Sequence, residues 1–272
     1  MDVLHQKQAK LEELLRAMGS AAVAYSSGVD STYLLHTARR VLGDRALAVT
    51  VRSAFCPNRE TREAEDFCRR EGIRHVIEDV AVLEIPGVAD NPPDRCYLCK
   101  KALFTRIREI ARANGAEHVA EGSNMDDLGD YRPGMAAVAE LGIESPLRAA
   151  ELYKSEIRAL SREQGLPTWD KPSFACLASR FVYGETITAE KLSMVERAED
   201  YLASLGFRQL RVRLHGDMAR IELPPEDMDR LFRQGLAGAV DEKLRALGFR
   251  YVSLDLRGYR TGSMNDALSG DK

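Results

Sequence analysis

One short loop carries groups suited to holding a phosphate. Residues 25–32 read Tyr-Ser-Ser-Gly-Val-Asp-Ser-Thr and lie between an apolar run and a segment with helical character. At a strand-to-helix turn, successive backbone N–H groups and the positive helix end converge on an anion. Gly28 permits backbone conformations that other residues avoid, and Asp30 can cap the helix or help to hold Mg²⁺. The hydroxyl donors are those of Ser26, Ser27 and Ser31.

This loop matches neither G-x-x-x-x-G-K-[ST] nor G-x-G-x-x-G. Its position directly after an expected strand and before an expected helix is the stronger argument for phosphate binding. The alternative is a serine- and glycine-rich helix cap that binds no ligand.

Three of the five cysteines stand in settings that suggest chemistry. Cys96 and Cys99 form a C-x-x-C pair, which is found in redox pairs, in halves of zinc sites and in iron–sulfur sites. The thioredoxin-like context of a redox pair is absent, and zinc would require two more soft ligands. Cys176 lies in a loop-like segment flanked by Lys171 and Arg180, whose charges favour a thiolate. The alternative for Cys176 is a small buried apolar residue.

The elements that position these residues alternate between short apolar runs and helix-length segments. Strands are expected at 21–25, 46–53, 74–80 and 118–123, with a short fifth at 144–149, and helices at 61–72, 100–115 and 154–167. This alternation predicts a doubly wound α/β fold, with a parallel sheet covered on both faces. Since ligands bind at the carboxyl ends of such strands, Gly122 and Ser123 are expected to join the nucleotide site. Cys68, on the first of these helices, is expected to pack in the core, and Cys56 to be passive.

After about residue 185 the pattern changes. Helices are expected at 188–206 and 226–247, and alternating segments at 208–224 and 251–260, with a hairpin turn at 215–217. This pattern predicts a small α+β domain with an antiparallel sheet, so the chain divides into domains at 1–185 and 186–272. Arg211 and Arg213 project from one strand face, where two guanidinium groups can grip a phosphate. The alternative is a solvated strand face.

Composition limits the class of protein. The formal net charge is -3, and no run approaches the roughly 20 apolar residues of a membrane helix. The N-terminal segment has the pattern of a charged amphipathic helix and not that of a signal peptide, so a cytoplasmic protein is expected. A stable complex with nucleic acid is disfavoured because it normally requires a clear positive footprint.

Six segments together resemble the LarE family of PP-loop ATP pyrophosphatases, and the resemblance covers nearly the whole chain. They are SSGVDST, NPPDRCYLCKKALF, EGSNMDDLGDYRPG, KPSFACLASRFVYG, RVRLHGDMARIEL and LDLRGYRTGSMN. One departure is Ser27, which stands where the PP-loop signature S-G-G-x-D-S has its first glycine.

The resemblance implies sulfur insertion in the nickel-pincer cofactor pathway that serves lactate racemase. ATP and Mg²⁺ would adenylate a carboxylate of pyridinium-3,5-biscarboxylic acid mononucleotide, and sulfur would then displace AMP to leave a thiocarboxylate. It further implies a homohexamer whose small domain serves the substrate and oligomerisation. Glu199 and Glu222 are candidates for a Mg²⁺ or substrate contact.

Two sulfur sources are compatible with the resemblance. In the sacrificial version the cysteine that matches Cys176 gives up its own sulfur and becomes dehydroalanine. Because the chain also has Cys96 and Cys99, it resembles a three-cysteine branch of the family. In that branch three thiolates hold a [4Fe–4S] cluster, and its free iron carries an extra sulfide.

Other functions compete with this interpretation. A tRNA thiolase of the PP-loop class also combines a C-x-x-C with a third cysteine, although the near-neutral charge disfavours RNA. An amidating NAD synthetase would not explain the cysteines. A non-catalytic nucleotide-binding sensor would favour a different glycine-rich loop.

Overall fold

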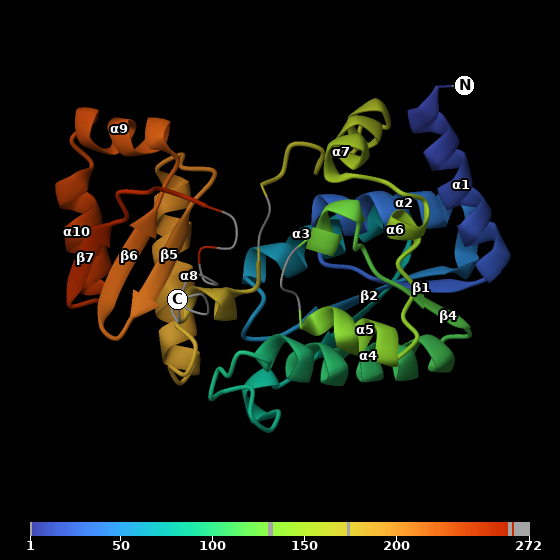
Figure 1. The fold of residues 1–272 in the computed structure, drawn as a ribbon, viewed down its shortest axis with the longest axis horizontal. Helices are drawn as coiled ribbons and strands as arrows, with labels where there is room; N and C mark the ends of the chain where they lie inside the picture. Colours follow the sequence, from blue (N-terminus) through green and yellow to red (C-terminus); the bar gives the residue numbers. More distant parts are fainter. Residues whose placement is uncertain (1, 130–132, 173–174, 261–262, 264–272) are drawn as a thin grey trace. The chain divides into compact units, whose positions relative to one another are not determined.

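The computed structural model describes residues 2–129, 133–172, 175–260 and 263. It divides into two compact units, one formed by 1–85 and 94–174 and the other by 86–93 and 175–272 (Figure 1). Each unit has its own sheet. The division of roles expected from the sequence, between 1–185 and 186–272, stays a prediction.

The first unit contains a parallel sheet in the strand order β3-β2-β1-β4. Its strands are β1 (Ala21–Ala24), β2 (Ala46–Arg52), β3 (Arg74–Asp79) and β4 (His118–Ala120). The chain adds strands outward from β1 to β3 and then returns to place β4 on the other side of β1. The strand order therefore reverses between β1 and β4, and this is the point where open α/β sheets bind ligands.

Helices cover both faces of this sheet (Figure 1). They are α1 (Val3–Met18), α2 (Val29–Leu42), α3 (Asn58–Arg70), α4 (Arg95–Ala113), α5 (Gly134–Glu140), α6 (Pro146–Ala149) and α7 (Lys154–Glu163). Ala21 and Val23 of β1 pack in one core with α1, α2, α3, α6 and α7. Ala22 packs in a second core with α4 and α5. The predicted doubly wound α/β fold is thereby confirmed.

The fifth strand expected at 144–149 is wrong. Glu144 makes a single parallel bridge to Ala120, and the chain then forms the short helix α6 from Pro146 to Ala149. Proline suits the first position of a helix because its missing N–H would have no partner there.

The second unit contains a three-stranded sheet in the order β5-β6-β7. It consists of β5 (Arg211–His215), β6 (Met218–Glu222) and β7 (Tyr251–Leu254), with α8 (Ala189–Ser204), α9 (Pro225–Arg233) and α10 (Ala237–Ala246). The expected hairpin joins β5 to β6, and Gly216 in its turn has φ +61°.

Two expectations for the second unit are wrong. The sheet is not wholly antiparallel, because β7 pairs with β6 in parallel. Such a pair needs a long crossover, which α9 and α10 supply. The single helix expected at 226–247 is therefore two helices, separated around Gly235 with φ +66°. No helix in the described part of the chain is long and apolar enough to cross a membrane.

Candidate active site

The serine- and glycine-rich loop connects β1 to the first turn of α2. Gly28 is the N-cap of α2. The hydroxyls of Ser26 and Ser31 lie 3.1 Å apart, and Ser31 Oγ donates to the carbonyl of Gly28 at 3.2 Å. The structure thus gathers two hydroxyl groups and the positive end of a helix at one point, an arrangement suited to a phosphate.

The end of β4 lies against this loop. A Cβ added to Gly122 would come within 3.1 Å of the Ser31 amide nitrogen and 3.3 Å of Asp30 Cβ. The neighbouring Ser123 is buried, and its hydroxyl donates to Glu121 Oε2 at 2.7 Å. The structure therefore brings Gly122 to the start of α2, at the reversal point of the sheet, with Ser123 next to it in the chain.

Asp30 has one carboxylate oxygen available for a cation. Its Oδ2 accepts from Lys154 at the start of α7, whereas its Oδ1 is buried without a hydrogen-bond partner. Burial raises the pKa of Asp30 above its usual value, and Lys154 opposes that shift. A buried carboxylate oxygen with open acceptor capacity fits a Mg²⁺ ligand. The sequence gives no signal for Lys154, since 124 positions separate it from Asp30.

Ser27 is anchored by a buried network in a left-handed conformation. Its φ is +53°, a region that costs most residues about 1–2 kcal/mol. Its hydroxyl donates to Glu60 Oε2 at 2.8 Å and to the Glu60 carbonyl at 3.1 Å. Lys171 Nζ donates to the same carboxylate oxygen at 2.6 Å and to the Ser27 carbonyl at 3.0 Å. Lys171, expected to act on Cys176, thus holds the loop.

Cys176 is exposed and precedes a short 3₁₀ turn, η4 (Leu177–Arg180). Arg180 at the end of that turn is fully buried, with 1% of its surface exposed. Its Nη1 donates to the carbonyls of Ala175 at 2.7 Å and Cys176 at 3.2 Å. A buried cation therefore contacts the backbone of the candidate sulfur donor.

Arg211 and Arg213 lie on β5 and are both buried, so the solvated strand face is wrong. Arg213 forms a fork with Glu222, with two contacts of 2.9 Å. The Arg211 guanidinium lies 5.2 Å from the ring centroid of Tyr259. Burial and the nearby Arg180 lower the pKa of Arg211 to about 10. Positive charges crowded in this way favour the binding of an anion.

The carboxylates of Glu199 and Glu222 are already occupied by protein donors. Glu199 Oε1 accepts from Arg180 Nε and from the Val212 amide, both at 2.9 Å, and its Oε2 accepts from Arg180 Nη2 at 3.0 Å. Burial alone would raise the pKa of Glu199, but the Arg180 guanidinium outweighs it and holds that pKa below its usual value. The Mg²⁺ or substrate contact expected for both glutamates stays a prediction, and these contacts favour a positioning role.

Cys96 and Cys99 lie in the first turns of α4 and are half-buried. Residues three apart share a helix face, so both thiols can serve one ligand. Within the described residues, no three His, Cys, Asp or Glu side chains form a ready metal-binding group. Cys68 is buried, and burial raises the pKa of its thiol to about 12, which confirms its expected place in the core.

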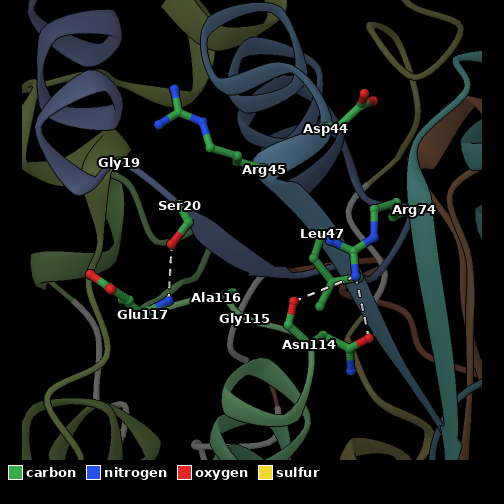
Figure 2. A pocket seen from close by; sticks show the side chains of 10 residues that line it. All are labelled: Gly19, Ser20, Asp44, Arg45, Leu47, Arg74, Asn114, Gly115, Ala116 and Glu117. Atoms are coloured by element: carbon green, nitrogen blue, oxygen red, sulfur yellow. Dashed lines mark hydrogen bonds between the residues drawn. The ribbon is translucent and has the colours of Figure 1, made fainter.

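A cavity of about 360 Å³ lies away from these residues, at the amino ends of the strands of the first sheet (Figure 2). Ser20 precedes β1, Arg45 precedes β2 and Glu117 precedes β4. Figure 2 shows Arg74 directed at Asn114 and the Glu117 amide directed at the Ser20 hydroxyl. Because ligands of this fold bind at the carboxyl ends, the cavity is not part of the candidate active site.

The strand order, with a serine- and glycine-rich loop at its reversal point, defines a PP-loop ATP-binding fold. No family model matches the chain. A similar protein is the pyridinium-3,5-bisthiocarboxylic acid mononucleotide synthase of Lactiplantibacillus plantarum, which is 39% identical over 99% of this chain and 97% of that protein. The chain therefore belongs to the family of this synthase, the LarE family.

The chain is also similar to two further proteins. An uncharacterized protein of Synechocystis sp. is 43% identical over 96% of this chain and 99% of its own length. A component of the glutamine-hydrolyzing GMP synthase of Thermoplasma volcanium is 30% identical over 67% of this chain and 63% of its own length. The match to the named synthase confirms, at the level of the family, the prediction of an ATP-dependent sulfurtransferase of the PP-loop class.

Proposed function

We propose that this enzyme converts the carboxylates of pyridinium-3,5-biscarboxylic acid mononucleotide to thiocarboxylates in nickel-pincer cofactor biosynthesis. The observation that carries the proposal is the near full-length match to a synthase named for the bisthiocarboxylic acid product. We further propose that it works in the cytoplasm as a homohexamer, for which light scattering on the purified protein is the test.

The first step is adenylation. A substrate carboxylate oxygen attacks the α-phosphorus of ATP, the bond to the β-phosphate breaks, and pyrophosphate leaves. The helix start, Gly28 and the hydroxyls of Ser26 and Ser31 would hold the departing pyrophosphate. Asp30 would bind Mg²⁺ through its open Oδ1, and the metal would neutralise phosphate charge. Gly122 and Ser123 would line the nucleotide site.

The substrate phosphate would bind at Arg211 and Arg213. Both guanidinium groups are buried and partly desolvated, which strengthens a charge-assisted contact. Binding energy from this remote phosphate would orient the reacting carboxylate.

The second step is sulfur transfer through Cys176. Its thiolate attacks the acyl carbon, a C–S bond forms, and AMP leaves with the electron pair of the broken C–O bond. In the sacrificial version the Cys176 Cα then loses a proton and the Cβ–S bond breaks toward sulfur. The products are a thiocarboxylate and dehydroalanine, and the step needs no oxidant or reductant.

A [4Fe–4S] cluster is the alternative sulfur route that we favour for this chain. Cys96 and Cys99 fit as ligands because one helix face presents both thiols, and Cys176 would supply the third thiolate. Cys96, Cys99 and Cys176 would hold such a cluster, and the bound cluster would supply sulfide for the activated carboxylate.

Two variants of the phosphate loop test the adenylation step. Asp30→Ala and Ser31→Ala are expected to nearly abolish substrate-dependent pyrophosphate release while circular dichroism stays unchanged. Asp66→Ala is the matched control, since this carboxylate is exposed on α3 and pairs with Arg69. ATP cleavage close to wild type in both loop variants would contradict the assignment.

The alternative functions make different predictions in the same assay. A tRNA thiolase would release pyrophosphate with tRNA and not with the pyridinium mononucleotide. A nucleotide-binding sensor would bind ATP without releasing pyrophosphate with either substrate.

A further inference from the structure

Arg180 is the largest of the fully buried side chains in the described part of the second unit, and every nitrogen of its guanidinium group is engaged. Nε and Nη2 form a fork with Glu199 at 2.9 and 3.0 Å. Nη1 contacts the Ala175 and Cys176 carbonyls and, at 2.9 Å, the Ser179 hydroxyl. One group therefore links a buried carboxylate on α8 to the backbone on both sides of Cys176.

The same carboxylate also ties this turn to β5. Glu199 Oε1 accepts from the Val212 amide at 2.9 Å, and Val212 stands between the two arginines that would bind the substrate phosphate. Arg213 Nη1 donates to the Ser179 carbonyl at 2.7 Å. Two routes thus link the turn after Cys176 to β5, the strand that would hold the substrate. One runs from Arg180 through Glu199 to the Val212 amide, and the other is the contact between Arg213 and the Ser179 carbonyl.

Coulombic attraction keeps both members of this pair charged. Burial would lower the pKa of Arg180, but Glu199 outweighs it and raises that pKa. An apolar pair of similar volume can stabilise a fold as well as a buried ion pair. What the ion pair adds is the set of directed contacts with the carbonyls of residues 175 and 176, because a guanidinium fork fixes geometry as well as charge.

We propose that Arg180 and Glu199 are positioning residues that fix the Cys176 backbone so that its sulfur meets the activated carboxylate. This inference deepens the proposed function and rests on it. Neither residue need touch the substrate, and Glu199 acts through Arg180. The pair would thus be required for sulfur transfer and not for adenylation.

The test uses the full-length double variant Arg180→Met/Glu199→Gln. Arg180→Met alone would leave a buried charge without its partner and is expected to destabilise the fold. The double variant removes both charges, while an amide oxygen at position 199 still accepts from the Val212 amide. Arg180→Lys serves as the charge-conserving variant, because lysine lacks the fork.

Pyrophosphate release and thiocarboxylate formation are measured separately in one anaerobic single-turnover assay. The double variant is expected to release pyrophosphate close to the wild-type rate. It is expected to transfer sulfur at least ~10-fold more slowly, because a misplaced Cys176 sulfur reacts less readily with the activated carboxylate. Arg180→Lys is expected to show the same split. Sulfur transfer at the wild-type rate, or an equal loss of both steps in a folded double variant, would overturn the proposal.

Hydrogen–deuterium exchange provides a readout without substrate. The Ser179 amide donates to the Cys176 carbonyl at 2.9 Å, and its exchange is expected to accelerate in the double variant. Unchanged exchange would also overturn the positioning role. If the wild-type protein releases no pyrophosphate with the pyridinium mononucleotide, the proposed function fails, whereas the exchange experiment still tests the pair.

Discussion

The half-buried carboxylate of Asp30 and the buried one of Glu199 differ in the number of donors that surround them. Burial raises the pKa of Asp30 despite its contact with Lys154, and one oxygen stays without a donor. The pKa of Glu199 is lowered instead, because Arg180 and the Val212 amide fill both of its oxygens. A cation can add to the first carboxylate but would have to displace existing partners at the second. These contacts favour Asp30 over Glu199 as a metal ligand, and both assignments stay predictions.

The two arginines of β5 are expected to behave differently on substitution. Arg211→Ala should weaken binding of the phosphorylated substrate by about 1.5–3 kcal/mol. The same substitution should weaken ATP binding far less. Arg213→Ala should weaken substrate binding as well, and should also lower the free energy of unfolding by about 3–5 kcal/mol, because Glu222 loses its buried fork partner. Calorimetric titration and urea unfolding measure these effects. Unchanged substrate affinity in both variants would exclude the phosphate site.

Substitutions at Ser27 separate backbone strain from hydrogen bonding. Ser27→Ala loses the contact with Glu60 and keeps the left-handed conformation, so we expect a loss of about 1.5–3 kcal/mol in unfolding free energy. Ser27→Gly loses the same contact but relieves a strain of about 1–2 kcal/mol. The glycine variant should therefore be the more stable of the two in urea unfolding. An alanine variant at least as stable as the glycine variant would contradict the anchored left-handed loop.

At the scale of elements, the close approach of the segment after β4 to α2 positions the loop proposed to bind phosphate. The reversal of strand order places the end of β4 beside the end of β1, and Gly122 lets the two backbones meet. Any larger residue there would press on the first turn of α2, which holds Asp30 and Ser31.

Gly122→Ala is expected to impair ATP use without unfolding the protein. The added Cβ would lie 3.1 Å from the Ser31 amide nitrogen, so the helix start must shift and the KM for ATP should rise. Gly238→Ala is the matched control, because a Cβ at this position in α10 meets nothing within 4 Å. That control should gain about 0.5–1 kcal/mol of stability, since alanine favours a helix. Unchanged pyrophosphate kinetics in Gly122→Ala would show that this contact does not position the loop.

Local patterns in the sequence predict the elements of the first unit well, because each strand is a short apolar run between helices. They do not predict how distant elements pair. Alternation in β7 is the same for a parallel and an antiparallel partner, so the parallel pairing with β6 was missed. Pro146 is a helix-start signal that argued against a strand at 144–149.

Partners within the site were harder to predict than its loops. Arg180 and Glu199 form a pair only through the packing of η4 against α8, and no spacing rule connects them. The expectation that Lys171 acts on Cys176 relied on proximity in sequence, whereas its side chain contacts Glu60 and Ser27. Sequence motifs therefore predict the loop and the strand that bears the arginines, whereas their buried partners depend on tertiary contacts.

At the scale of the whole molecule, the groups that the proposed reaction requires are divided between the two units. The phosphate loop, Cys96 and Cys99 belong to the first unit, and Cys176 belongs to the second with the arginines of β5. The three thiolates of the proposed cluster therefore come from both units.

The sulfur source is decided by the mass of the protein after turnover. We expect anaerobically prepared protein to bind iron and sulfide through Cys96, Cys99 and Cys176, since cysteine thiolates are the usual ligands of iron–sulfur clusters. Cys96→Ser and Cys99→Ser should each lose the iron, while Cys56→Ser, the matched control, should keep it. Cluster-borne sulfur leaves the polypeptide mass unchanged and allows repeated turnover with added sulfide, whereas sacrificial transfer removes one sulfur and two hydrogens and stops after one event. Dehydroalanine at position 176 in turned-over, iron-replete protein would overturn the cluster route and establish the sacrificial one.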